Sequence, residues 1–140
     1  MKININLIIV MVLFVVILIN YVNVFPNEFV WDDIFFIVDN IHIKELSNIP
    51  GFFAEPSTSN LYRPLRNVFY TINYQIWQLN IFGYHLNSLL LHFLVTILLF
   101  FITLRITNKT IFSFVVALFF ASHPIHTGRI TNITASFDVY

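Results

Sequence analysis

The chain has 140 residues, of which 58% are hydrophobic and only 10% are charged, and its formal net charge is zero. Globular proteins carry about 25% charged residues, so this composition excludes a soluble domain and indicates an integral membrane protein. The zero net charge gives no reason to expect nucleic acid as a partner, and the absence of cysteine excludes disulfides and thiolate metal sites.

A segment without charged side chains opens the chain between Ile3 and Asn27. Residues 7–19 are apolar without interruption, and Pro26 marks the end of the run. We therefore predict a membrane span over about residues 3–25. A cleaved signal peptide is the alternative, but the run is long for one and no small-x-small cleavage site follows it.

Two more apolar runs predict a second span over about residues 84–104 and a third over about residues 110–125. The third apolar run is short for a membrane span, so the span either extends beyond the run or is tilted. Lys2 precedes the first span, and Arg105 and Lys109 lie between the second and third. Two crossings return the chain to its starting side, so the positive-inside rule predicts a cytoplasmic N-terminus.

The segment of residues 26–83 is then an extracytoplasmic loop that contains its own helix. Pro64 can serve as the first residue of that helix. Apolar residues recur at helical spacing along one face, which predicts an amphipathic helix on the membrane surface. They are Leu65, Val68, Phe69, Ile72, Ile76 and Leu79. The side chains on the opposite face of this helix could bind sugars, or they could be the ordinary polar and aromatic side of an interfacial helix. They are Arg66, Tyr70, Asn73 and Trp77.

An acid pair, Asp32 and Asp33, follows Trp31 directly after the first predicted span. A carboxylate at the membrane surface can act as a general base toward a hydroxyl group, and the pair could bind a divalent cation. The alternative is an acidic start to the loop with a helix cap, since aspartate is favoured there. No other metal site is predicted.

Two arginines, Arg63 and Arg66, are candidates for binding the phosphate of a lipid-linked substrate, because a guanidinium group can contact two phosphate oxygens at once. Tyr62 and Pro64 fix Arg63 at a helix entry. The alternative is that both arginines extend toward lipid headgroups or pair with acids of the same loop.

The histidines form two groups. His123 and His126 flank Pro124 at the end of the third span, where the proline disfavours a helical zinc site and a hydrogen bond to a sugar or phosphate fits better. They could also be an interfacial pair. His85 and His92 lie seven residues apart on the second span, and the deeper His92 is a site candidate or a partner for a neighbouring helix.

An ordered set of motifs resembles the polyprenyl-phosphate-sugar glycosyltransferases of the GT-C fold. The branch that it resembles most is the membrane O-mannosyltransferases with tetratricopeptide repeats and their bacterial relatives. The motifs are Phe29-Val30-Trp31-Asp32-Asp33, Asn48-Ile49-Pro50, Tyr62-Arg63-Pro64-Leu65, Asn73-Tyr74, Trp77, Leu79-Asn80, Phe82-Gly83-Tyr84-His85-Leu86 and His123-Pro124-Ile125-His126-Thr127.

The resemblance implies an all-α membrane fold and an enzyme that moves a sugar, commonly mannose, from a polyprenyl (dolichyl) phosphate to a hydroxyl of a protein or another acceptor. Transfer would occur on the extracytoplasmic side of an endoplasmic reticulum membrane or a bacterial inner membrane. By analogy, Asp32 would be the general base, Asp33 its partner, and Arg63 the cation that helps the phosphate to leave. The substrate would also contact Tyr62, Arg66, His123, His126 and Asp138.

The sequence departs from the family pattern near its end. Gly128 stands where the family usually has glutamate, and Ala135 and Ser136 stand where it usually has glycine and arginine, although Asp138 is retained. The family has further spans after the point that corresponds to Tyr140, so we expect residues 1–140 to be the N-terminal part of a longer GT-C domain. The alternative function is a catalytically inactive membrane fragment that associates with other membrane helices.

Overall fold

The computed structural model describes residues 4–54 and 62–135 of the chain. Within these ranges all regular structure is helical and no strand occurs, which confirms the predicted all-α class. The elements are α1 (Ile5–Tyr21), η1 (Val22–Val24), η2 (Ile34–Val38), η3 (Ile41–Lys44), η4 (Leu46–Phe53), α2 (Pro64–Trp77), α3 (Ile81–Thr107), α4 (Thr110–Ser122), η5 (Pro124–His126) and α5 (Thr127–Thr131).

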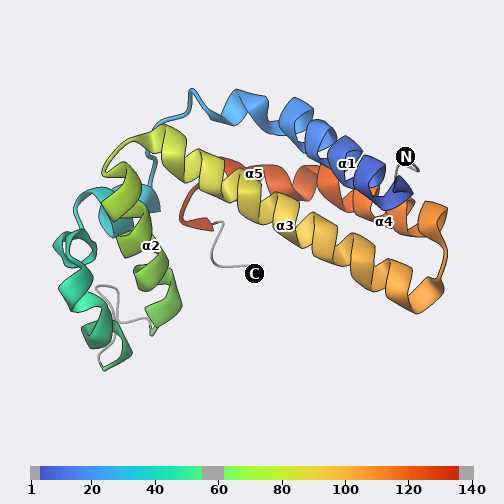
Figure 1. Cartoon of the computed structure of the whole chain (residues 1–140). Helices are drawn as coiled ribbons and strands as arrows, with labels where there is room; N and C mark the ends of the chain where they lie inside the picture. Colours follow the sequence, from blue (N-terminus) through green and yellow to red (C-terminus); the bar gives the residue numbers. More distant parts are fainter. Residues whose placement is uncertain (1–3, 55–61, 136–140) are drawn as a thin grey trace.

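Three long helices, α1, α3 and α4, pack side by side and form the body of the molecule (Figure 1). The connection from α3 to α4 is tight because Asn108 ends α3 in the left-handed conformation, with φ 53°. On α4, Ala117 and Ala121 are fully buried. Small residues one turn apart let the helix backbones approach closely, which is how apolar helices associate in a membrane.

Among the described residues, two segments are long and apolar enough to cross a membrane, Ile5–Val24 and Ile81–Thr107. A third crossing is formed if α4 and the helical segment Pro124–Thr131, which bends by 43° from it, count as one span. The bend falls at His123, directly before a proline that cannot continue the hydrogen-bond pattern of α4.

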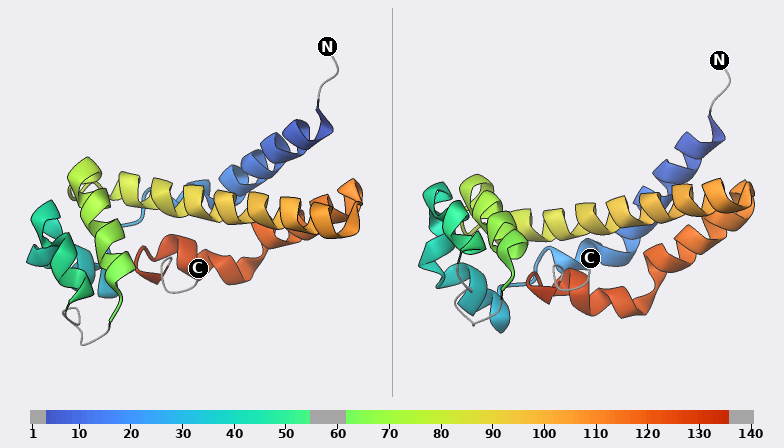
Figure 2. Two further views of the ribbon diagram at one scale, coloured as in Figure 1. Left: turned by 60° about the horizontal axis from the view of Figure 1, so that its bottom comes forward. Right: turned by 90° about the horizontal axis from the view of Figure 1, so that it is seen from below.

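At one end of the bundle, α2 packs against η3, η4 and the start of α3 (Figure 2). Pro64 begins this helix, as the sequence predicted. The polar side of α2 faces the protein, since Arg66, Asn67 and Asn73 are buried there. Its apolar side faces outward, which is the orientation expected of a helix that lies against lipid.

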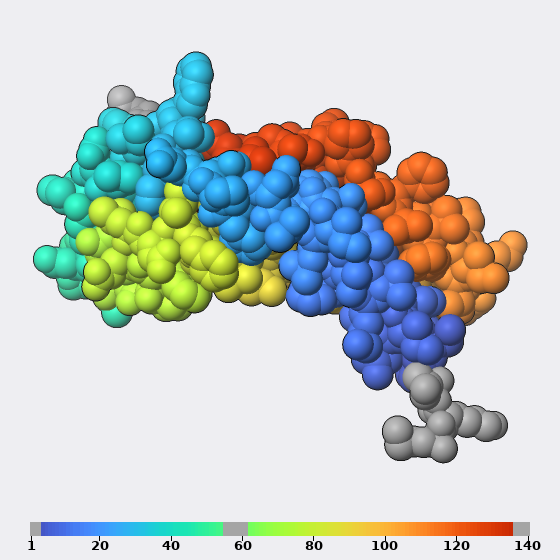
Figure 3. Space-filling view, turned by 90° about the horizontal axis from the view of Figure 1, so that it is seen from above, coloured from blue at the N-terminus to red at the C-terminus, as the bar shows by residue number. Residues whose placement is uncertain are grey.

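The chain segment that follows α1 lies beside the C-terminal part of the described chain. On the face seen in Figure 3, the residues after α1, in cyan, adjoin those of α5, in red. A small apolar cluster joins the two regions and includes Phe36 and Ile37 of η2 together with Ile133. The contact brings residues about a hundred positions apart in sequence into one region.

Candidate functional site

The acid pair lies in a short and unusual stretch of backbone. Trp31, just before it, has φ 49°, a left-handed conformation that a bulky residue adopts only when the surroundings impose it. The Trp31 side chain is 86% exposed, so burial of its indole does not explain this conformation. Directly after the pair, η2 is a single π-helical turn, a form that often occurs at functional sites.

The two carboxylates of the pair have opposite environments. Asp32 is exposed, whereas Asp33 has 0% of its surface exposed. A base that takes a proton from a hydroxyl must reach the substrate, and only the Asp32 side chain meets that condition. Asp33 has the environment of a structural acid.

Backbone N–H groups hold the Asp33 carboxylate in place. The N–H of Thr134 donates to Oδ1 at 2.8 Å, and the N–H of Val30 donates to Oδ2 at 3.3 Å. Hydrogen bonds to a carboxylate are stronger than those between neutral groups. Asp33 therefore fastens the C-terminal segment to the loop that carries Asp32.

One histidine is buried beside the segment that leads to the acid pair. His85, on the first turns of α3, has 0% of its surface exposed. The backbone of Asn27 and that of Ile130 lie against its ring, and the charge of Asp33 acts on it at longer range. Position along the second span favoured His92 as the site candidate, and its Nε2 lies 3.3 Å from the Ala121 carbonyl oxygen, deep among the helices. The position of His85 beside Asn27 and Ile130 depends on long-range packing, so helical spacing alone did not indicate it.

The predicted phosphate ligands occupy two different settings. Arg66 is buried, and its guanidinium carbon lies 4.1 Å from the centre of the Phe36 ring. Arg63 is half-buried at the start of α2. Tyr62 is exposed and its hydroxyl donates to the Phe53 carbonyl at 3.2 Å. The stacking on Phe36 joins the first turn of α2 to η2, the element that follows the acid pair.

His123 and His126 lie at the bend after α4, where His123 is exposed and the half-buried His126 belongs to an aromatic group with His92 and Phe120. The rings of His126 and His92 have centroids 5.1 Å apart, and those of His126 and Phe120 are 4.4 Å apart. The hydroxyl of Tyr21 donates to the carbonyl of His123 at 3.5 Å. The group connects α1, α3 and α4 at the bend. Asp138, the remaining predicted contact, lies outside the described residues.

Among residues 4–54 and 62–135, no three histidine, aspartate or glutamate side chains come together in a way that could hold a metal ion. Asp33 already receives a backbone N–H on each of its two oxygens. A divalent cation at the acid pair would therefore depend on Asp32 and on ligands from elsewhere.

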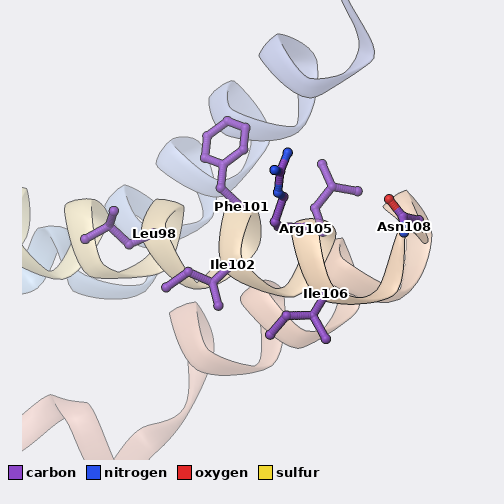
Figure 4. A pocket seen from close by; sticks show the side chains of 7 residues that line it. Leu98, Phe101, Ile102, Arg105, Ile106 and Asn108 are labelled. Atoms are coloured by element: carbon purple, nitrogen blue, oxygen red, sulfur yellow. The ribbon is translucent and has the colours of Figure 1, made fainter.

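A hollow of about 600 Å³ occurs on the last turns of α3 (Figure 4). It lies at the opposite end of that helix from His85. Its lining is apolar apart from Arg105 and Asn108. A surface without a carboxylate or a histidine has no group that could move a proton, so we place the candidate site at the acid pair. The lining residues are Leu98, Phe101, Ile102, Leu104, Arg105, Ile106 and Asn108.

Comparison with curated proteins finds relatives of one kind. The chain is 34% identical over 128 residues to the protein O-mannosyl-transferase TMTC1 of Homo sapiens, covering 81% of the chain and 14% of that protein. It is 30% identical over 115 residues to TMTC3 of Homo sapiens, covering 75% and 12%. The protein O-mannosyl-transferase F38B6.6 of Caenorhabditis elegans is 26% identical over 129 residues, covering 84% and 19%. The chain thus spans less than a fifth of the length of these relatives.

No family model matches the sequence, and no solved structure matches it.

Proposed function

We propose, for a chain related to the protein O-mannosyl-transferases, that it forms part of an enzyme that transfers mannose to a hydroxyl group of a protein. The names of the relatives supply the sugar and the class of acceptor. The observation that carries the proposal is the acid pair, in which an exposed Asp32 stands beside a buried and fixed Asp33.

In the proposed reaction, Asp32 takes the proton of a serine or threonine hydroxyl on the acceptor. The hydroxyl oxygen forms a bond to the anomeric carbon of mannose while the bond from that carbon to the phosphate oxygen breaks. The phosphate leaves with the electron pair of the broken bond, and the anomeric configuration is inverted. Asp33 keeps Asp32 at the angle needed for this displacement, since small errors in position are costly in catalysis.

The donor in this proposal is a polyprenyl phosphate sugar, whose lipid tail would lie in the membrane beside the apolar helices. A phosphate that leaves as an anion needs a cation nearby. Arg63, half-buried at the start of α2, is our candidate for that cation, and Tyr62 and Arg66 are proposed to line the same side. His123 and His126 are proposed as hydrogen-bonding contacts for the sugar or the phosphate, and so is Asp138.

The proposed enzyme crosses the membrane more than once, with a cytoplasmic N-terminus and the acid pair on the extracytoplasmic side. In the structure, the start of α1 and the connection between α3 and α4 lie at one end of the bundle, and α2 lies at the other (Figure 1). This arrangement supports a common side for the start of α1, Arg105 and Lys109. The membrane would be that of the endoplasmic reticulum or the inner membrane of a bacterium.

The test is transfer of radiolabelled mannose from dolichyl phosphate to a serine- and threonine-rich protein, catalysed by the full gene product in nanodiscs. We expect Asp32→Asn to lower transfer at least about 100-fold, since a positioned base contributes roughly that much or more. Donor binding should be retained, because the exposed carboxylate acts on the acceptor. Asp39→Asn, an exposed acid of the same loop, is the matched control.

Full transfer by the Asp32→Asn variant would refute the role of this residue. Absence of both donor binding and transfer in the unmodified protein would instead favour an inactive membrane protein that associates with other helices. The departures at Gly128, Ala135 and Ser136 make this second outcome worth testing.

A further inference from the structure

The hollow on the last turns of α3 has no part in the proposed transfer reaction, but it has the dimensions of a binding site. Its volume is about 600 Å³. Sites for small molecules commonly have about 300–1,000 Å³, so the hollow can hold part of a lipid. Its apolar side chains are accessible from outside the bundle, since Leu98 is 51% exposed, Phe101 44%, Ile102 56% and Ile106 75%. The hollow is therefore open to the surrounding membrane.

The lining runs lengthwise along α3 toward the end of the helix. Leu98 lies seven residues before Arg105, which is in the last turn. At a rise of about 1.5 Å per residue, this stretch is roughly 10 Å long. One half of the hydrocarbon core of a bilayer is about 15 Å thick, so the stretch matches the upper part of an acyl chain whose headgroup lies beside Arg105.

Arg105 gives this apolar surface a charged group at the end where a headgroup would lie. Phe101 and Arg105, one turn apart, extend from the same side of α3 (Figure 4). Arg105 is exposed, and its guanidinium group makes no hydrogen bond or ion pair within the described parts of the chain. Asn108 caps the helix instead, since its N–H donates to the Leu104 carbonyl at 2.9 Å. The guanidinium donors are therefore available to a ligand.

The charges near the hollow favour an anionic ligand. Lys109 follows directly after Asn108 and adds a second exposed cation. The acids of the described chain all fall between residues 28 and 45, in the segments at the other end of the bundle (Figure 1). A zwitterionic headgroup would bring its ammonium group toward two cations, whereas an anionic headgroup has none. The positive-inside rule assigns this end to the cytoplasm, where the leaflet contains anionic phospholipids.

We infer that the hollow binds one anionic phospholipid, with its phosphate on Arg105 and an acyl chain along Leu98 and Ile102. A guanidinium group contacts two phosphate oxygens at once, which gives such a contact its strength and direction. Basic pockets between membrane helices on the cytoplasmic side bind acidic headgroups in this way. The site is separate from the acid pair and does not depend on the proposed transferase activity.

Native mass spectrometry of the full gene product in a neutral detergent tests the site. The probes are phosphatidylglycerol and phosphatidylcholine of equal chain length, and we expect phosphatidylglycerol to be retained in preference. Arg105→Gln should retain one phosphatidylglycerol fewer, because loss of charge-assisted hydrogen bonds lowers the affinity of that site at least about tenfold. Lys109→Gln removes an equal charge outside the lining and is the matched control. It should change the affinity less than about twofold, since a neutral micelle has no surface potential.

Two further variants distinguish a shaped site from a charged helix end. Arg105→Lys keeps the charge but loses the planar fork, so we expect it to restore only part of the binding. Ile102→Trp keeps every charge and fills the hollow, so it should lose the same lipid as Arg105→Gln. Its control is Ile111→Trp on α4, at a position that is 80% exposed and outside the lining, which should retain the lipid.

Several results would overturn the inference. Equal losses in Arg105→Gln and Lys109→Gln would mean that charge alone, and not the hollow, holds the lipid. Full retention in Ile102→Trp would place the lipid elsewhere. No preference for phosphatidylglycerol in the unmodified protein would mean that another part of the full gene product covers the hollow. Displacement of phosphatidylglycerol by a lower concentration of dolichyl phosphate would assign the hollow to a polyprenyl phosphate.

Discussion

Asp32 and Asp33 are neighbours in sequence, but the short helical turn that contains them directs one carboxylate outward and the other inward. The sequence predicted the pair and its two roles by analogy. It could not predict which acid would be buried, because the burial of Asp33 depends on Thr134, a residue that lies 101 positions further along the chain. Nothing local in the motif indicates such a contact.

Because Asp33 is buried and Asp32 is exposed, substitution of the two acids should change the stability of the protein by different amounts. Asp33→Asn removes the charge and leaves one acceptor oxygen where two N–H donors converge, so one buried backbone group loses its partner. We expect a loss of about 1–3 kcal/mol in the free energy of unfolding. Asp32→Asn changes an exposed side chain and should stay within about 0.5 kcal/mol of the unmodified protein.

Thermal unfolding of both variants in the same detergent measures this contrast, and the melting temperature should fall for Asp33→Asn alone. An equal fall in both variants would mean that Asp32 also has a structural role. Unchanged stability of Asp33→Asn would show that the hydrogen bonds from Val30 and Thr134 contribute little.

At the scale of single elements, α2 was predictable in position but its packing was not. Pro64 and the apolar spacing after it predicted a helix and its lipid-facing side, and Leu65 and Ile76 are indeed 75% and 63% exposed. The polar row with Arg66 and Asn73 was predicted to bind sugar or to be an ordinary polar face. In the structure these two side chains are buried against the protein, where Arg66 stacks on Phe36.

The corner between α2 and α3 depends on one glycine. Gly83 does not have a positive φ, so a side chain there would not strain the backbone. However, a Cβ at this position would fall against the Trp77 ring, 2.6 Å from its Cε3 atom. We expect Gly83→Ala to destabilise the protein by about 1–3 kcal/mol, because the indole must move to make room.

Unfolding measurements on Gly83→Ala should be compared with Gly128→Ala. An added Cβ at Gly128, on α5, meets nothing within 4 Å, so that change should be neutral or stabilising by up to about 1 kcal/mol. A Gly83→Ala variant as stable as the unmodified protein would show that the Trp77 ring does not rest against this glycine.

At the scale of the whole molecule, composition alone was sufficient for the class, because lipid-facing helices need apolar side chains throughout. The boundaries of the apolar runs also follow from sequence, since charged or breaking residues such as Pro26 and Arg105 end them. The bend of 43° after α4 was left open by the sequence, which allowed either a continued or a tilted span. The choice depends on how α5 packs against α3, and periodicity does not encode that contact.

The arrangement of the bundle makes a definite prediction about the two sides of the membrane. The connection between α3 and α4 lies at the end of the bundle opposite α2 and η4 (Figure 1). Since the chain has no cysteine, Ser47→Cys on η4 and Asn108→Cys at the connection each introduce one reactive thiol at an exposed position. A maleimide that cannot cross membranes should therefore label the two variants from opposite sides of sealed vesicles of known orientation.

The positive-inside rule assigns the Asn108 side to the cytoplasm, because Arg105 and Lys109 flank it. Labelling of both variants from the same side would contradict a crossing by α3, and labelling of Ser47→Cys from the cytoplasmic side alone would reverse the proposed orientation and place the acid pair away from an extracytoplasmic acceptor.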